Sequence, residues 1–303
     1  MMDRKDVSKV LRRNVAALSK HTEKELSMMP ATEAPLPSVE DVREIVALVK
    51  KIVFTDYFHK RLPDEEIRSY HIGVHMEDLF RLLRMQIARG LQFCEECDDD
   101  DVLGRAEEMA LRFIDGLPEI KRLLFTDVEA MFDNDPAARN YGEVIFSYPS
   151  VNAMTHYRVA HMLHQMNVPV IPRIITEQAH SKTGIDIHPG AEIGEFFSID
   201  HGTGVVIGET AIIGSHVSLY QGVTLGAKSF KYDEDGKMLN FPRHPIIEDY
   251  VTIYSNASVL GRITIGRGSV IGGNLWLTHD VPPNSRILQS KAVDVGYQGG
   301  LGI

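Results

Sequence analysis

The order of apolar and polar residues divides the chain into two parts with different periods. Up to about residue 183, apolar residues recur at spacings of three and four, as in the segments 42–53, 76–87 and 154–163. This is the 3.6-residue period of amphipathic helices. Three prolines between residues 30 and 37 separate the first helical segment from the second. The run 97–101, a cysteine followed by four aspartates, is expected to form a solvated turn that caps the next helix.

From Ile185 onward the period of the apolar residues becomes six. An aliphatic residue recurs every six positions, with one step of eight and one long break, and a second apolar residue often precedes it by two positions. The aliphatic positions are 187, 193, 199, 207, 213, 219 and 225, and then 247, 253, 259, 265, 271 and 277. Self-similarity at a fixed period indicates a repeat architecture, here built of hexapeptides.

Each hexapeptide has the length of one short strand and one turn. Three of them, about 18 residues, make a triangular coil whose aliphatic side chains point inward and stack about 4.8 Å apart. Gly or Asn at the corners supplies positive φ angles. The sequence therefore predicts an α+β protein with a helical domain (residues 1–183), a parallel β-helix (184–287) and a flexible C-terminal tail (288–303).

Composition and charge exclude several classes of protein. Of the 303 residues, 44% are apolar and 24% charged, which is ordinary for a globular protein. The net charge is −10, and both 1–184 (24 basic, 30 acidic) and 185–303 (8 basic, 12 acidic) are acidic, which disfavours nucleic-acid binding. No apolar run approaches the roughly 18 residues of a membrane span, and no secretory signal is evident. With only two cysteines, a disulfide framework is excluded, and we expect a cytoplasmic protein.

The step of eight residues between Ile199 and Ile207 adds two residues at one corner of the predicted coil, and it contains His201. By the repeat register, Asp186 shares this corner one coil below, and we expect it within hydrogen-bond reach of His201. An aspartate that fixes the tautomer of a histidine and stabilises its imidazolium makes that histidine a good general base. A capping aspartate beside a surface histidine is the alternative interpretation.

Several motifs in a fixed order closely resemble the serine O-acetyltransferases, a family of hexapeptide-repeat acyltransferases. They are Asp186-Ile187-His188-Pro189, Asp200-His201-Gly202-Thr203-Gly204, Gly208-Glu209-Thr210, Gln221-Gly222-Val223-Thr224-Leu225-Gly226 and Arg243-His244-Pro245. The resemblance covers about residues 130–285, including Asp135-Pro136-Ala137 in the helical part. It implies a left-handed β-helix and transfer of an acetyl group from acetyl-CoA to the hydroxyl of L-serine, which yields O-acetylserine, the precursor of cysteine.

The resemblance also assigns roles to residues outside the His201 corner. Asp135 and Asp200 would bind the ammonium group of serine. Arg243 would bind its carboxylate, since a guanidinium can grip a carboxylate with two hydrogen bonds. His244 matches the second active-site histidine of the family and could contact serine.

The co-substrate CoA is expected along a groove between neighbouring β-helices, near Gly226, Ala227 and Ser255. A backbone N–H near Gly226 could stabilise the thioester oxygen as charge builds on it. The reaction requires no metal and no permanently bound cofactor.

The long break in the repeat, from Leu225 to Ile247, encloses the segment 227–244, which includes three lysines. This segment could project between subunits and cover CoA, or it could be a solvated hairpin. It also leaves open whether His244 joins the His201 of its own chain or that of a neighbour. The resemblance implies a homotrimer or a dimer of trimers, a hexamer in which the helical part pairs the trimers.

Other functions compatible with the same fold stay open at this stage. The chain could acetylate a sugar or another hydroxyl, although a zwitterionic substrate needs the charges of both signs noted above. It could also be a catalytically silent scaffold. A zinc hydratase is disfavoured because the histidines fall at different phases of the repeat, and the pair Cys94 and Cys97 lacks two further zinc ligands. Trp276 is expected to be a packing residue.

The tail ends in four glycines among its last nine residues and a terminal isoleucine, Ile303. Such a segment has too little apolar surface to offset its ordering entropy. It resembles the serine acetyltransferase tails whose terminal isoleucine enters the active site of O-acetylserine sulfhydrylase, which is therefore an expected partner. L-Cysteine is an expected feedback inhibitor because it differs from serine by sulfur in place of oxygen.

Overall fold

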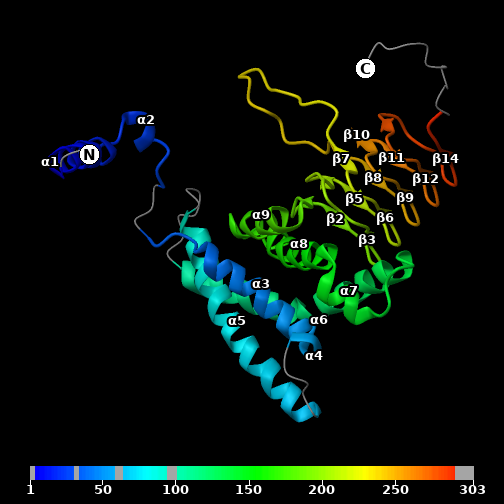
Figure 1. The fold of residues 1–303 in the computed structure, drawn as a ribbon, viewed down its shortest axis with the longest axis horizontal. Coiled ribbons are helices and arrows are strands. Elements are labelled where there is room, and N and C mark those ends of the chain that lie inside the picture. The colour runs from blue at the N-terminus through cyan, green and yellow to red at the C-terminus, as the bar shows by residue number, and fades with distance from the viewer. Residues whose placement is uncertain (1–3, 31–33, 59–63, 94–100, 291–303) are drawn as a thin grey trace.

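The computed structural model describes residues 4–30, 34–58, 64–93 and 101–290. Up to Thr183 these residues form helices, and from Asp186 onward they form short strands (Figure 1). The helices are α1 (Arg4–Leu18), α2 (Glu23–Leu26), α3 (Val39–Val53), α4 (Thr55–Phe58), α5 (Glu65–Phe93), α6 (Val102–Asn134), α7 (Tyr141–Ser147), α8 (Pro149–Gln165) and α9 (Ile171–Thr183). The three segments with helical periodicity lie in α3, α5 and α8.

Local signals explain where several helices begin and end. The side chain of Ser38 accepts a hydrogen bond from the N–H of Asp41 at the start of α3. Asp101 does the same for Gly104 at the start of α6, which confirms the predicted cap at that residue. Gly184 ends α9 with a φ of 72°, in the left-handed region where a glycine carries no Cβ penalty.

The strands form three parallel sheets, which we call sheets A, B and C. Sheet A is β1 (Asp186–Ile187), β4 (Val206–Ile207), β7 (Thr224–Gly226), β10 (Ser258–Leu260) and β13 (Trp276–Leu277). Sheet B is β2 (Glu192–Ile193), β5 (Ile212–Ile213), β8 (Ile246–Ile247) and β11 (Thr264–Ile265). Sheet C is β3 (Ser198–Ile199), β6 (Ser218–Leu219), β9 (Thr252–Ile253), β12 (Val270–Ile271) and β14 (Arg286–Ile287).

Up to β13 the chain visits sheets A, B and C in turn, so each sheet receives every third strand. After β13 only the isolated bridge of Val281 to Ile265 continues sheet B, and β14 follows in sheet C. The register pairs the aliphatic positions of the repeat with one another: Ile187 with Ile207 and Ile207 with Leu225 in sheet A, for example. Their side chains are buried, so the hexapeptide period does mark an inward-facing stack. The predicted α+β architecture, with a left-handed parallel β-helix after the helices, is confirmed.

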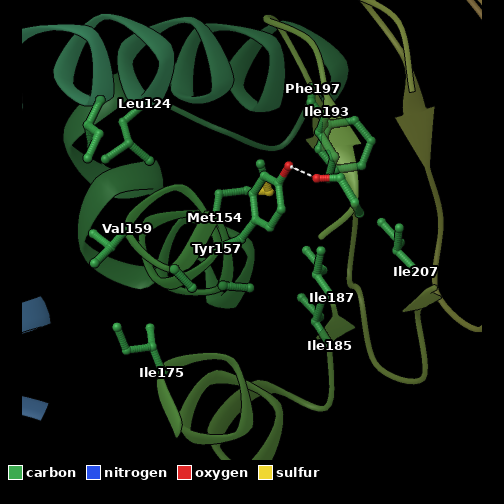
Figure 2. Packing of buried hydrophobic residues seen from close by; sticks show 14 of the residues in the cluster. Leu124, Met154, Tyr157, Val159, Ile175, Ile185, Ile187, Ile193, Phe197 and Ile207 are labelled. Carbon is green, nitrogen blue, oxygen red and sulfur yellow. Dashed lines mark hydrogen bonds between the residues drawn. The ribbon is translucent and has the colours of Figure 1, made fainter. Parts of the chain in front are cut away.

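The helical part and the β-helix share one core. Tyr157 of α8 lies between them and donates a hydrogen bond from its hydroxyl to the carbonyl of Ala191 at 2.6 Å (Figure 2). Ile187 and Ile193 of the first coil belong to the same buried cluster as the helix residues Met154 and Ile175. This continuity fixes the end of α6, and with it Asp135, relative to the first coils.

A buried ion pair strengthens the same junction. The Arg158 guanidinium of α8 contacts the Asp127 carboxylate of α6 at 2.9 Å, with side chains only 3% and 1% exposed. Arg158 also donates to the carbonyls of Ile193 and Gly194, both at 2.6 Å. Asp127 accepts from the N–H of Phe197 at 3.2 Å. The pair therefore satisfies polar groups of two helices and of the β-helix at once.

Two segments extend from this body. Helices α1 and α2 lie apart from the other helices, and the loop between β7 and β8 projects from the stack of strands (Figure 1). Residues 228–240 of that loop are exposed, and Tyr232 and Met238 form an antiparallel bridge within it. The loop is thus a hairpin-like arm in this single chain, and its relation to CoA stays a prediction.

One packing expectation is wrong. Trp276 lies at the outward-facing position of β13 and is 70% exposed, because the inward position of that strand belongs to Leu277. Cys94, Cys97 and Ile303 lie outside the described residues.

Candidate active site

The first group of candidate residues lies where the chain passes from sheet C to sheet A, which we call the CA corner. Asp200 and His201 follow β3 here, and His201 has a φ of 55°. A Cβ at Gly202 would lie 2.5 Å from Cδ1 of Ile185, so only glycine fits against the core at this turn. The imidazole of His201 is 70% exposed, with Nδ1 3.4 Å from the nearer carboxylate oxygen of Asp200.

Asp186 shares the CA corner, since it pairs with Val206 in the register of sheet A. The expected hydrogen bond to His201 is not formed: within residues 101–290 no hydrogen bond or ion pair joins the two side chains. The carboxylate that approaches the imidazole is that of Asp200.

Asp135 reaches the same corner from the end of α6. The amide of Asn134 donates to the hydroxyls of Ser198 and Ser218, at 2.9 and 3.1 Å, and so fixes the helix end on sheet C. The Asp135 carboxylate accepts hydrogen bonds from the hydroxyl of Tyr148 and the N–H of Ala137.

These contacts keep the Asp135 carboxylate ionised. The Tyr148 hydroxyl is the largest cause that lowers the pKa of Asp135, followed by the Ala137 N–H, and the charge of His201 also lowers it. In return, the pKa of Tyr148 rises to about 12. The CA corner thus presents an anionic Asp135 beside Asp200, as binding of an ammonium group requires.

The second group lies where the chain passes from sheet A to sheet B, which we call the AB corner. Arg243 and His244 come directly before β8, and the Arg243 guanidinium donates to the carboxylate of Glu209 at 2.7 Å. Nδ1 of His244 accepts the backbone N–H of Thr210 at 3.0 Å. Burial is the largest cause that lowers the pKa of His244.

The two corners lie at opposite ends of the strands of sheet A. Residues 204–208 separate them, a span of roughly 13 Å. No hydrogen bond or ion pair described between residues 101 and 290 links Asp135, Asp200 or His201 to Arg243 or His244. The single chain therefore does not bring all the predicted substrate-binding residues together.

The residues expected near CoA divide in the same way. Gly226 and Ala227 follow the inward Leu225 of β7 and leave sheet A toward the AB corner. Ser255 follows β9 of sheet C at the CA corner. Whatever joins the two corners into one site would therefore unite the CoA residues as well.

Sequence reasoning gave no role to several residues that hold these corners. Glu209 and Thr210 lie within a quoted motif, but their contacts with Arg243 and His244 depend on the return of the chain after the long loop. Tyr148 precedes α8 and no periodicity marks it. Only the helix-to-strand packing shows that its hydroxyl meets Asp135.

Metal and membrane features are absent from the described ranges. No group of three or more His, Cys, Asp or Glu side chains there is arranged to hold a metal ion. In the same ranges, no helix is both long and apolar enough to span a bilayer.

Comparisons with known proteins agree with this architecture. No protein-family model matches the chain. A relative from Synechococcus elongatus, named as a plasmid serine acetyltransferase, is 47% identical over 276 residues, which cover 89% of this chain and 86% of the relative.

Solved structures give the same result. Serine acetyltransferase isoform 3 from Entamoeba histolytica, in complex with cysteine, superposes with a TM-score of 0.72 at 31% identity and covers 96% of this chain and 94% of its own. Soybean serine acetyltransferase complexed with serine has a TM-score of 0.54 at 28% identity, over 82% of this chain and 97% of its own. The chain belongs to the serine acetyltransferase family.

Proposed function

We propose that this protein transfers the acetyl group of acetyl-CoA to the hydroxyl of L-serine, the first step toward cysteine. The observation that carries the proposal is that the two corners carry charges of opposite sign. The CA corner offers the carboxylates of Asp135 and Asp200, and the AB corner offers the guanidinium of Arg243. Free serine carries an ammonium and a carboxylate, whereas a sugar hydroxyl needs neither partner. The serine- and cysteine-bound relatives support the same substrate class.

In this proposal His201 is the general base. Its exposed ring accepts the hydroxyl proton of serine as the oxygen attacks the thioester carbon. The tetrahedral intermediate then collapses, the C–S bond breaks, and the proton passes to the CoA sulfur. Asp200 or Asp186 stabilises the imidazolium that exists between the two steps. A backbone N–H near Gly226 stabilises the oxyanion, and no metal or resident cofactor takes part.

The site is completed by a neighbouring chain. The CA corner of one chain and the AB corner of the next would meet in a trimer whose β-helices lie side by side. This arrangement brings His201 to Arg243 and His244, and it places Ser255 opposite Gly226 and Ala227. The residues at opposite ends of the sheet A strands of one chain would thus line one groove for CoA and serine, formed between two chains.

The test of the activity is release of CoA thiol from acetyl-CoA in the presence of L-serine, with O-acetylserine identified by mass spectrometry. L-Alanine, which lacks the hydroxyl, and a panel of sugars are the matched acceptors. Of these acceptors, we expect only serine to cause thiol release from acetyl-CoA. Release with a sugar but not with serine would assign the chain to the alternative acetyltransferase class, and release with neither would support the scaffold.

L-Cysteine would inhibit by competition with serine, because the groups that hold ammonium and carboxylate do not distinguish the two. Arg243→Ala should weaken serine and cysteine binding together, with Arg286→Ala on the exposed strand β14 as control. Weaker binding of only one of the two amino acids would contradict a shared site.

The C-terminal tail is proposed to bind O-acetylserine sulfhydrylase through Ile303 and its carboxylate. Deletion of Ile303 should abolish the complex and leave acetyl transfer unchanged, since the catalytic corners lie in the β-helix. Calorimetry with full-length and 1–302 proteins is the measurement, and equal affinities would remove the tail from the interaction.

A further inference from the structure

The hydrogen bonds around His244 define which of its ring nitrogens carries the proton. The N–H of Thr210 points at Nδ1 from 3.0 Å, and the Thr210 hydroxyl lies 2.9 Å from the same atom. A backbone N–H can only donate, so Nδ1 must be an acceptor with a free lone pair. In the neutral ring the proton is therefore on Nε2.

The Thr210 hydroxyl is itself held in one orientation. Its oxygen accepts the backbone N–H groups of Arg243 at 2.9 Å and of His244 at 3.1 Å. Because these two donors occupy the oxygen, the hydroxyl hydrogen is left to donate to Nδ1 of His244, whose single lone pair it shares with the Thr210 N–H. The guanidinium of Arg262 donates hydrogen bonds to the carbonyl of Thr210 at 2.6 Å and to that of His244 at 3.0 Å, which also hold these two residues in place.

The other edge of the ring rests on Gly208. A Cβ at this position would lie 2.0 Å from Cδ2 and 2.1 Å from Nε2 of His244, so the ring fits only against glycine. His244 is 7% exposed, yet Nε2 has no hydrogen-bond partner among the described residues and is not one of the fully buried unpaired atoms found there. It is the one polar atom of the ring left for a ligand.

The surrounding charges favour the neutral ring. Burial lowers the pKa of His244, Arg243 and Arg262 lower it further, and Glu209 alone raises it. The charge of His244 also lowers the pKa of His188, which lies two coils below at the same corner. Protonation would place a hydrogen on Nδ1, directly against the Thr210 N–H.

We infer that His244 serves as a neutral Nε2–H hydrogen-bond donor to an oxygen of the bound substrate, and that Thr210 is the positioning residue that fixes this tautomer. The inference rests on the proposed acetyl transfer, because it names what the AB corner offers to serine beside Arg243. It also gives the two active-site histidines different roles. His201 accepts a proton, whereas the one lone pair on the neutral His244 ring, that of Nδ1, already accepts hydrogen bonds from Thr210.

Two substitutions at residue 244 distinguish the tautomers. The amide N–H of glutamine reaches the place of Nε2–H, whereas that of asparagine reaches the place of Nδ1. We expect His244→Gln to retain kcat/KM for serine within about tenfold and His244→Asn to lose about 10²-fold. Equal losses in both variants, or better activity in His244→Asn, would overturn the inference.

Substitutions at Thr210 test the positioning role. Thr210→Val keeps the shape but removes the hydroxyl, so protonation of His244 becomes easier and the acid limb of kcat/KM should move to higher pH. We also expect about a tenfold loss of kcat/KM, with both changes reversed in Thr210→Ser. An unshifted acid limb in a folded Thr210→Val protein, or no recovery in Thr210→Ser, would contradict the role of the hydroxyl.

A spectroscopic readout is independent of turnover. Long-range ¹H–¹⁵N correlation spectra of ¹⁵N-histidine-labelled full-length protein, with the His244 signals assigned by their loss in His244→Gln, report the tautomer directly. We expect a neutral ring with the proton on Nε2 at pH 7. A proton on Nδ1, or an imidazolium, would overturn the inference even if the wild type acetylates serine. The proposed function fails separately, by absence of serine-dependent CoA release.

Discussion

At the scale of single residues, the chemistry depends on where the repeat is interrupted. The two extra residues of the corner after Ile199 lift His201 out of the stack of inward side chains, and Gly202 closes the turn against Ile185. The same insertion places Asp200 beside the ring. The eight-residue step thus places the proposed base at an exposed corner, next to a carboxylate.

His201→Ala should lower kcat by about 10²–10⁴-fold, since the variant lacks the base, while the fold is kept because the side chain is exposed. Asp186→Asn and Asp200→Asn should each cost less. Steady-state rates of CoA release with saturating serine measure all three. Near-normal turnover of His201→Ala would remove it as the base, and a larger loss in Asp200→Asn than in Asp186→Asn would make Asp200 the residue that stabilises the imidazolium.

Buried histidines should make the fold sensitive to acid. The ring of His156 donates from Nδ1 to the carbonyl of Asn152 at 2.7 Å, and burial, aided by Lys182 and Lys50, lowers its pKa to about 4. Burial also lowers the pKa of His188 to about 4. Because the unfolded chain binds these protons near pH 6.5, the free energy of unfolding should fall between about pH 6.5 and pH 4.

The contribution of His156 to this loss is up to about 3 kcal/mol. His156→Asn keeps a donor near the place of Nδ1 but does not titrate, so unfolding by denaturant should depend less on pH in this range. His279→Asn, at the exposed surface, is the control. A pH slope equal to that of the wild type would show that His156 is not the titrating group.

At the scale of the elements, the junction between helices and β-helix depends on one buried ion pair. Arg158 and Asp127 connect α8 and α6, and through three backbone groups they also hold the first coil. Removing one partner leaves the other charge buried without compensation. Such a loss is much more destabilising than removal of an exposed pair.

Arg158→Met should therefore reduce the free energy of unfolding by about 3–5 kcal/mol. Arg122→Met is the matched control, because Arg122 also bridges α6 to the β-helix, through Glu195, but is half exposed and should cost less than about 1 kcal/mol. Denaturant unfolding at one fixed protein concentration compares the two. Similar losses would show that burial of the pair is not what holds the junction.

The sequence was most informative where one physical period dominates. Every aliphatic position of the repeat lies on a strand, because stacking of inward side chains fixes both the period and the register. It was less informative where distant segments meet. The Asp135–Tyr148 contact and the Thr210–His244 contact follow from helix packing and from the return of the chain after residues 227–244. The prediction that Trp276 is a packing residue is wrong because an aromatic side chain can also occupy the outward position of a strand.

At the scale of the whole molecule, sheet A separates what the reaction must bring together. The CA corner lies at one end of its strands and the AB corner at the other, so in the proposed reaction another chain completes the site. We therefore expect sedimentation to show a trimer or a dimer of trimers. A stable, fully active monomer would contradict the shared site.

The most direct test is activity recovered from two inactive variants. His201→Ala damages only the CA corner and Arg243→Ala only the AB corner. In trimers co-expressed from equal amounts of both, about a quarter of the interfaces combine an intact CA corner with an intact AB corner. We predict serine-dependent CoA release near a quarter of the wild-type rate in the mixture, far above either variant alone. Activity of the mixed trimers no higher than the mean of the two variants would show that each site lies within one chain and would contradict the account.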